Sequence, residues 1–220
     1  MLPIVYHSNY SCPFPSGHRF VMRKFVDLYQ QVLKLGLIAP DHNNLYTPQA
    51  ATIEDLACVH DAGYLQSLVG NNVDQKAWRR VGLPWSQGLV ERTLTAPNGT
   101  LLSARLALQK GLACHLAGGT HHAHFDFGSG FCMINDLAYT AQTLLQNGEV
   151  KRVLIFDLDV HQGDGTAAIL QNQHNAFTCS IHCQKNFPFR KQNSDLDIGL
   201  EKGLEDAAYL QVWPKPLINY

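Results

Sequence analysis

Two short segments of the chain concentrate the residue types that could do chemistry. The first, residues 157–165 ("DLDVHQGDG"), places three aspartates and a histidine directly after the apolar run 153–156. In an extended chain the side chains alternate, so Asp157, Asp159 and His161 lie on one side. Carboxylates gathered at a buried strand end repel one another and raise each other's pKa unless something positive holds them. A metal ion, a cationic partner or plain solvent exposure would each meet that requirement.

The second segment, residues 118–132 ("GGTHHAHFDFGSGFC"), is rich in histidine and glycine. The chain contains eleven histidines, and four of them fall within ten residues: His115, His121, His122 and His124. A single histidine near a strand is most often a hydrogen-bonded core residue, which is how we interpret His60, His115 and His182. The tandem histidine, the two glycine-rich turns and the aspartates of the first segment together predict a metal-dependent site.

The side chains in these segments include ligand types that zinc prefers. Asp159 and His161 offer an oxygen and a nitrogen to one ion, which suits Zn²⁺ and is also compatible with Fe²⁺ or Mn²⁺. Asp157 and Asp164 remain as carboxylates that can accept a proton from a histidine and orient its ring. A histidine oriented in this way, beside water acidified by a metal ion, can act as a general base.

Alternating strands and helices should position both segments. We expect strands at 3–6, 112–119, 153–157 and 176–183, helices at 21–35, 52–69, 100–110, 136–147 and 165–171, and a loop with a short helix at 70–99. This alternation is typical of a parallel α/β sheet, whose ligands bind at the carboxyl ends of the strands. Both segments should therefore meet at one sheet edge. Without repeats or linker-like stretches, residues 1–220 are expected to form a single domain.

The composition excludes several classes of function. The formal net charge of −1 and the sequence pI of about 6.8 argue against nucleic-acid or acidic-membrane partners. No stretch approaches the roughly 20 apolar residues of a membrane span. The first residues lack a basic region followed by an apolar one, so we expect a cytoplasmic protein. The six cysteines form no Cys-x-x-Cys pair, which favours a reducing compartment and argues against a zinc knuckle.

The same segments carry a family resemblance. "GGTHHAHFDFGSGFCMIND" and "VLIFDLDVHQGDGT" resemble the two signature segments of the histone deacetylase superfamily of zinc amidohydrolases. Other segments of the superfamily are resembled by "HRFVMRKF", "TIEDLACVHDAGYL" and "CSIHCQKNFPFRKQNSDLDIGL". The sequence of these segments is similar to that of bacterial members near class IV. The resemblance covers nearly the whole chain. It implies a three-layer α/β/α fold with a parallel sheet, of the arginase/deacetylase type, and a hydrolase that removes acetyl or longer acyl groups.

The resemblance also implies roles for individual residues. It matches the zinc ligands to Asp159 and His161, the general base to His122, and an electrostatic partner or proton donor to His121. Asp157 and Asp164 match the carboxylates that support His121 and His122, respectively. The acyl-lysine channel and the acetate exit path are matched by Gly130, Phe131, Phe187 and Arg19.

Two cofactors and a range of substrates follow from the same resemblance. Zinc is the first cofactor, and a monovalent cation, potassium, is the second. The cation site, formed largely by main-chain carbonyls, matches Asp157, Asp159, His161, Ser180 and Ile181. An acetylated lysine peptide, an acetylpolyamine or another small acylated amine would be the partner.

The family's third zinc ligand, an aspartate, and its oxyanion-stabilising tyrosine belong to segments later than those matched here. Neither Asp206, in a helix-like run, nor Tyr220, without a glycine context, is expected to replace them. We therefore expect residues 1–220 to represent the N-terminal two-thirds of the fold, with the C-terminal third absent. The absent strands would belong in the middle of the sheet, so this chain alone should be neither an active deacylase nor a tight zinc binder.

Two alternatives of other classes remain open. The motif "DVHQGD" loosely echoes the Asp-x-His-x-Asp of arginase-type hydrolases that bind two Mn²⁺ ions, although the tandem histidine and "GSGFC" favour the deacetylase. Metal analysis would distinguish one zinc from two manganese ions per chain. The other alternative, suggested by the truncation, is a catalytically inactive fragment or binding module of the same fold.

Overall fold

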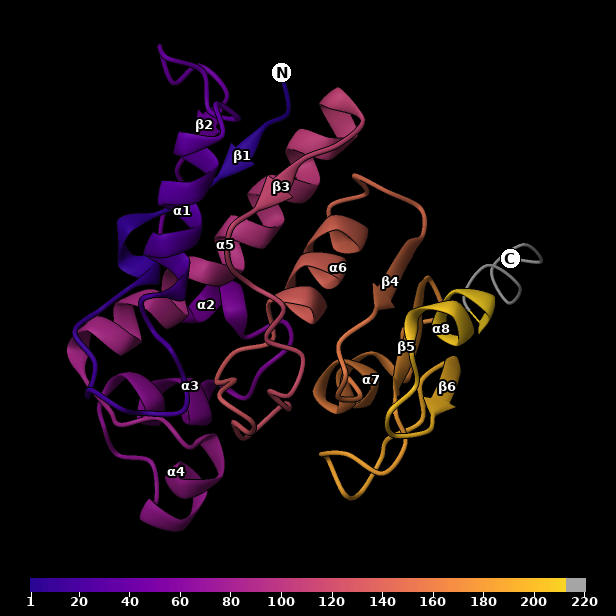
Figure 1. Ribbon diagram of the computed structural model, residues 1–220. Helices are drawn as coiled ribbons and strands as arrows, with labels where there is room; N and C mark the ends of the chain where they lie inside the picture. The colour runs from indigo at the N-terminus through magenta and orange to yellow at the C-terminus, as the bar shows by residue number, and fades with distance from the viewer. Residues whose placement is uncertain (213–220) are drawn as a thin grey trace.

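The computed structural model describes residues 1–212, which form two sheets of parallel strands and the helices that pack against them (Figure 1). The first sheet has the order β2-β1-β3 and contains β1 (Ile4–Val5), β2 (Leu45–Tyr46) and β3 (Cys114–His115). The second has the order β4-β5-β6 and contains β4 (Val153–Asp157), β5 (Ala176–Cys183) and β6 (Leu196–Leu200). Every pair of neighbouring strands is parallel, so the predicted α/β class with parallel strands is confirmed.

The two sheets are separate, and each has an edge strand next to the segments of interest. Within residues 1–212, β3 is an edge of the first sheet and β4 an edge of the second, and the two do not pair. The two segments expected to meet at one sheet edge therefore follow strands of two different sheets. Apolar side chains are correspondingly exposed along β4 and the residues after it, with Leu154 and Val160 each 52% exposed. An unpaired edge with apolar side chains is prone to self-association.

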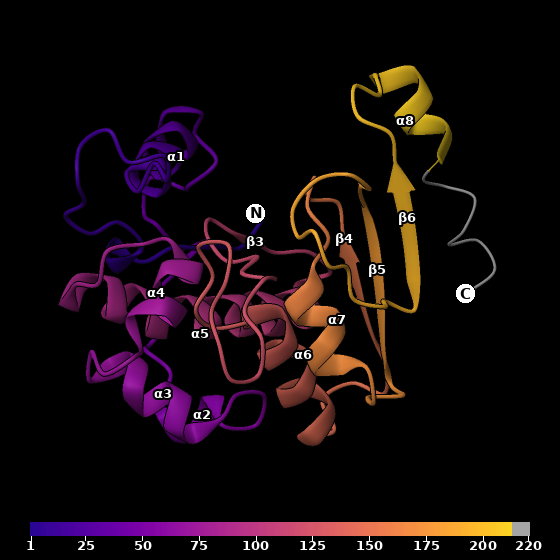
Figure 2. The same ribbon diagram turned by 90° about the horizontal axis from the view of Figure 1, so that it is seen from below.

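The helices of the N-terminal half cover the first sheet. They are η1 (Ser8–Tyr10), α1 (Lys24–Lys34), α2 (Ile53–Leu56), α3 (Ala62–Val69), α4 (Gln75–Val81) and α5 (Gln87–Lys110). Val32 of α1 packs on Ile4 of β1 in a small apolar cluster, while α5 contacts both β1 and β3. Figure 2 shows α1 and α5 on opposite sides of these strands. This half is therefore layered as helix, sheet and helix.

Of the remaining helices, the first two lie between this half and the second sheet, and the third follows β6. They are α6 (Asp136–Gln146), α7 (Asp164–Leu170) and α8 (Asp206–Val212). α6 packs against α5 on one side and β4 on the other, and α7 packs against α6 and β5 (Figure 2). The largest apolar cluster runs from Tyr10 of η1 to Ala176 of β5, so one buried core extends through both halves.

The predicted helix ends are confirmed where a capping residue marked them. Thr52 and Asp55 form the expected reciprocal capping box at the start of α2. Gly36 and Gly111 follow α1 and α5 with φ angles of 67° and 87°, a left-handed conformation that glycine adopts without strain. Asn135 caps α6 as predicted, accepting a hydrogen bond from the Ala138 amide.

Two predicted boundaries are wrong. The helix expected at 52–69 is divided into α2 and α3, because Asp61 caps a second helix. The segment 70–99, expected to be a loop with a short helix, contains that short helix as α4 but also the first half of α5, which begins after Ser86 and continues through Pro97. Glycine, proline and asparagine in this stretch suggested a loop, but much of that half of α5 is buried against the core, which overrides local propensity.

The strands differ from expectation mainly in length and number. The strands predicted at 3–6 and 112–119 pair over two residues each, in β1 and β3. β2 and β6 were not predicted, and β6 lies in a segment that we treated as a loop. Asp206 begins α8, in agreement with its helix-like run, whereas Tyr220 lies outside the described residues. Within residues 1–212, none of the helices combines the length and apolarity needed to cross a bilayer.

Candidate active site

A buried carboxylate holds the loop that carries the tandem histidines. Asp136, the first residue of α6, accepts hydrogen bonds from the backbone amides of Gly119 (2.9 Å) and Thr120 (2.7 Å). The hydroxyl groups of Thr120 and Thr100 donate to the same carboxylate at 2.6 and 2.5 Å. A Cβ at Gly118 would lie 2.5 Å from Asp136 Oδ2, so the close approach requires glycine there. The conformation of the loop is thereby fixed before His121.

Asn135 supports the same loop from its other side. Its Nδ2 donates to the carbonyl oxygens of Ala123 (3.0 Å) and His121 (3.4 Å). Its backbone amide donates to Nε2 of His60 at 2.9 Å, and Nδ1 of His60 faces the Phe125 carbonyl at 3.2 Å. His60 is therefore the buried, hydrogen-bonded histidine that we expected, and burial lowers its pKa to about 4.

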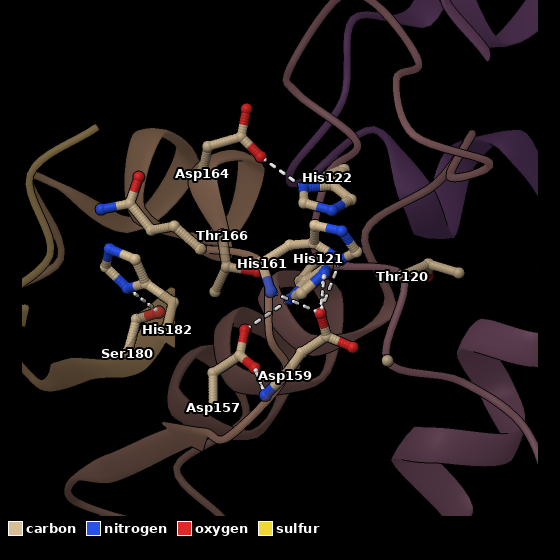
Figure 3. A network of polar contacts seen from close by, with 12 residues as sticks. Thr120, His121, His122, Asp157, Asp159, His161, Asp164, Thr166, Ser180 and His182 are labelled. Carbon is tan, nitrogen blue, oxygen red and sulfur yellow. Dashed lines mark hydrogen bonds and ion pairs between the residues drawn. The ribbon is translucent and has the colours of Figure 1, made fainter. Parts of the chain in front are cut away.

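Each tandem histidine is hydrogen-bonded to its own aspartate (Figure 3). Nδ1 of His121 lies 2.5 Å from Asp157 Oδ2 at the end of β4, and Nδ1 of His122 lies 2.6 Å from Asp164 Oδ1 at the start of α7. The ring centroids of the two histidines are 4.1 Å apart. The expected pairing of histidines with carboxylates is present, and it leaves Nε2 of His122 as the ring nitrogen available for proton transfer.

Asp164 also receives a hydrogen bond that sequence reasoning missed. Nε2 of His124 lies 3.0 Å from Asp164 Oδ2, and its ring stacks on Phe127 with centroids 4.3 Å apart. Burial alone would raise the pKa of Asp164, but the hydrogen bonds from His122 and His124 outweigh it and lower the pKa to about 2. His124 belongs to the histidine-rich run, which was the available signal for its involvement.

The two tandem histidines differ in their electrostatic environment. Burial and the neighbouring His121 and His161 lower the pKa of His122, although the hydrogen bond to Asp164 opposes this shift. For His121, burial opposes protonation, but the hydrogen bond and charge of Asp157 outweigh it and raise the pKa. Environments that move two neighbouring pKa values apart are typical of an acid–base pair, with His122 as the neutral member.

The loop after β4 presents the predicted metal ligands. The backbone amide of His161 donates to Asp159 Oδ1 at 2.8 Å, and Nδ1 of His161 lies 2.9 Å from the same oxygen. The amide of Asp159 in turn donates to Asp157 Oδ1 at 2.9 Å. The Asp159 and His161 side chains are 50% and 36% exposed, so both can reach an ion from solvent.

The carboxylate oxygen of Asp159 and the imidazole nitrogen of His161 are both ligand types that zinc binds. Asp159 Oδ1 and Nδ1 of His161 are 2.9 Å apart, a hydrogen-bond distance, whereas two ligands of one tetrahedral zinc ion would lie about 3.3 Å apart, so a small separation of the two side chains would admit the ion. Catalytic zinc sites normally have a third protein ligand. Within the part of the chain that the structure describes, no group of three or more His, Cys, Asp or Glu side chains is arranged to hold a metal ion.

A pocket of about 620 Å³ joins these groups to the predicted substrate channel. It is lined by both tandem histidines, both candidate zinc ligands, and Arg19, Gly130, Phe131 and Phe187. The Phe187 ring lies edge-on to His122, with centroids 4.9 Å apart. A Cβ at Gly130 would lie 2.6 Å from the His122 ring and 2.9 Å from the Phe187 ring, so only glycine leaves this passage open.

Arg19 lies over the Phe131 ring, its guanidinium carbon 5.0 Å from the centroid. Three further cations, Lys24, Arg80 and Arg92, line the same pocket and were not singled out from the sequence. No motif marks them, because α1, α4 and α5 bring them together from distant parts of the chain.

Three of the five residues predicted for the monovalent-cation site are neighbours in the second sheet. Asp157 pairs in register with Ser180 across β4 and β5, and Ile181 follows, 2% exposed. The Ser180 hydroxyl lies 3.0 Å from Nδ1 of the buried His182, which is a hydrogen-bonded core residue as expected. The presence of potassium there stays a prediction.

Known proteins resemble the chain throughout its length. The histone deacetylase domain family matches residues 18–218. An uncharacterised protein of Picosynechococcus sp. (strain ATCC 27264 / PCC 7002 / PR-6) is 52% identical over 210 residues, covering 96% of this chain and 69% of that protein. Acetoin utilization protein AcuC of Staphylococcus aureus (strain MSSA476) is 28% identical over 90% of this chain and 56% of its own length.

Solved structures show the same fold. An HDAC homolog from Aquifex aeolicus matches with a TM-score of 0.76 at 24% identity, and an HDAC homolog complexed with SAHA matches with a TM-score of 0.79 at 24% identity. Each match covers 96% of this chain and 62% of the other. The chain thus spans roughly three-fifths of the length of these structures.

Proposed function

The chain belongs to the histone deacetylase domain family, and we propose that its pocket serves the zinc-dependent hydrolysis of an acylated, lysine-like amine. The observation that carries the proposal is the pair of adjacent histidines, each hydrogen-bonded to its own aspartate, in one pocket with Asp159 and His161. A satisfied core histidine explains one such contact. Two adjacent rings lining a pocket beside a carboxylate–imidazole pair are better explained by acid–base chemistry.

Asp159 and His161 would hold the zinc ion. When bound, zinc supplies a Lewis acid that polarises the acyl carbonyl and acidifies water. The backbone amide of His161 holds the Asp159 carboxylate, and the hydrogen bond between Nδ1 of His161 and the same oxygen orients the imidazole ring before metal arrives. That preorganisation supports the assignment, because oriented ligands lose less conformational entropy on binding.

His122 would take the proton of the attacking water at Nε2, while Asp164 keeps Nδ1 protonated and stabilises the cation that forms. The hydroxyl group of water then joins the acyl carbon as the carbon–nitrogen bond breaks. The proton passes to the leaving nitrogen, which gives a carboxylic acid and an amine. His121, held by Asp157, would stabilise the negative charge that develops on the acyl oxygen.

Substrate class, second cofactor and location are further parts of the proposal. Acetylated lysine peptides, acetylpolyamines and small acylated amines share the chemistry of this pocket, in which Gly130 and Phe187 form a narrow passage beside His122. A potassium ion at Asp157, Ser180 and Ile181 would compensate the buried aspartate. A reducing, cytoplasmic location would suit six free cysteines.

The test is acetyl-lysine hydrolysis by the zinc-loaded full-length protein, with and without a chelator, beside metal analysis and an assay of urea release from arginine. We expect chelator-sensitive release of acetate with zinc as the stoichiometric metal. Urea release with two manganese ions per chain would favour the arginase-type alternative. Zinc binding without any turnover would favour a binding module.

A further inference from the structure

The pocket contains more positive charge than the proposed reaction requires. Four cations line it, Arg19, Lys24, Arg80 and Arg92, whereas Asp159 is the one carboxylate among its lining residues in the described part of the chain. Arg19 and Arg80 lie over Phe131 and Phe127 and are exposed at the surface. Lys24, which is also exposed, and Arg92, which is buried, lie over the same two aromatic rings, and this shared position needs a separate explanation.

Arg92 is a buried cation without a direct ion pair, although the buried Asp136 acts on its charge at longer range. It is 4% exposed, and its Nε donates to the Tyr10 carbonyl at 3.1 Å. Among residues 1–212, no carboxylate lies within ion-pair distance of its guanidinium. The Phe25 ring, 4.6 Å from the guanidinium carbon, offsets part of the cost of burial by a cation–π contact. A guanidinium has five N–H donors, so this arrangement leaves capacity for an anion on the pocket side.

Lys24 converges on the same place from α1. Its Nζ lies 4.6 Å from the Phe20 ring and 5.1 Å from the Phe25 ring, the two rings that Arg92 also contacts. Like charges held this close repel each other unless an anion lies between them. The pair shares its pocket with His121 and His122, so an anion bound there would be part of the same ligand as the reacting amide.

We propose that this pocket selects acyl groups that end in a carboxylate, the half-amides of short dicarboxylic acids, and that Lys24 and Arg92 bind this carboxylate. This specificity rests on the proposed hydrolase function. Guanidinium and ammonium groups form short, charge-assisted hydrogen bonds with carboxylates, and these are stronger where water is excluded. An acyl group with a neutral end would leave both cations unpaired.

Calorimetric binding of two matched probes to the purified chain tests the proposal without requiring turnover. The probes are the amides of Nε-succinyl-lysine and Nε-succinamyl-lysine, which differ only in a terminal carboxylate against a terminal carboxamide. We expect the succinyl probe to bind at least about tenfold more tightly, the factor that one hydrogen bond to a charged group contributes. Equal affinities for the two probes would overturn the proposal.

Variants assign the selectivity to this pair of cations. Lys24→Gln changes an exposed residue and should remove most of the difference between the probes, while Lys34→Gln, at the other end of α1, should retain it. Arg92→Lys keeps the charge but loses the planar guanidinium, which can donate to both oxygens of a carboxylate, and should weaken binding of the succinyl probe severalfold. Selectivity unchanged in both Lys24→Gln and Arg92→Lys would contradict the assignment.

A third probe and an activity assay separate this proposal from the function on which it rests. Acetyl-lysine with a free α-carboxylate carries its charge at the amine end; if it binds as tightly as the succinyl probe, the cations do not recognise the acyl end. Hydrolysis of acetyl-lysine without discrimination between the two acyl probes would uphold the function and reject the selectivity. Tighter binding of the succinyl probe without hydrolysis of acetyl-lysine would uphold the selectivity and reject the proposed hydrolase function.

Discussion

Asp159 and His161 lie next to Asp157, yet the three side chains should respond differently to substitution. Asp159→Asn and His161→Ala remove proposed ligands and should each lose zinc. Asp157→Asn weakens the support of His121 and should lower the free energy of unfolding by about 1–3 kcal/mol, the cost of an unsatisfied buried partner, with zinc largely retained. Metal analysis and urea denaturation of the three variants, made in the full-length protein, provide the comparison. Full zinc occupancy in Asp159→Asn would refute its role as a ligand.

His124 tests whether Asp164 needs both of its imidazole partners. His124→Ala removes the 3.0 Å hydrogen bond to Asp164 and should let this carboxylate rotate away from His122. We expect turnover to fall about threefold to thirtyfold, in line with a hydrogen bond of 0.5–2 kcal/mol, with KM little changed. His124→Gln can still donate to Asp164 and should recover most of the loss. If alanine and glutamine behave alike, His124 has no positioning role.

At the scale of elements, His60 links the start of α3 to the cap of α6. Burial holds its folded pKa at about 4 against an ordinary value of 6.5, so the unfolded chain binds more protons between these pH values. The free energy of unfolding should therefore rise as the pH increases from 4 to 6.5. The part of it that depends on neutral His60 is complete above pH 6.5 and is lost as the pH falls toward 4. The shift corresponds to a contribution on the order of 3 kcal/mol.

His60→Gln should flatten this part of the pH dependence. Glutamine can accept from the Asn135 amide and donate to the Phe125 carbonyl but does not titrate, whereas His174→Gln, at an exposed position, serves as the control. Urea denaturation at pH 4.5 to 7.5 measures the slope. The same slope in His60→Gln and the unsubstituted chain would contradict the assignment.

Element prediction succeeded where a local signal was strong. Thr52 and Asn135 mark helix starts, and the apolar run before Asp157 marks β4, so these could be read from the sequence. The first half of α5 could not, because Pro97 and its neighbouring glycines argue for a loop and only burial against the core favours a helix. β6 could also have been predicted, because Leu196, Ile198 and Leu200 alternate as in a strand. We missed it because the histidine- and glycine-rich segments were the stronger signals.

Some residues of the candidate site could likewise be predicted from the sequence, and others could not. The two signature segments identify the histidines, their aspartates and the candidate zinc ligands, because each set is contiguous in sequence. Lys24 and Arg92 are brought together only by the packing of α1 and α5 around Phe25, so no local pattern could place them. The second role of Asn135, holding the carbonyl of His121, likewise depends on the folded path of the loop.

At the scale of the whole molecule, the unpaired edge of β4 should govern the behaviour of the isolated chain. Leu154, on this edge, is 52% exposed, and the neighbouring Leu158 and Val160 extend its apolar surface. We expect residues 1–220 to self-associate, and Leu154→Lys to shift the population toward monomer. Leu35→Lys, at an equally apolar but distant position, should have little effect. Size-exclusion chromatography with light scattering measures this; a monomer at all concentrations would contradict it.

The central claim is that His122, held by Asp164, is the general base of a zinc-dependent amide hydrolase. The most direct measurement is turnover of an acetyl-lysine peptide by the zinc-loaded full-length protein carrying His122→Ala, with the zinc content of the same sample determined in parallel. We predict a decrease in kcat of about 10²–10⁴-fold, the usual contribution of a positioned base, at unchanged zinc content. Turnover close to that of the unsubstituted protein, with zinc bound, would contradict the account.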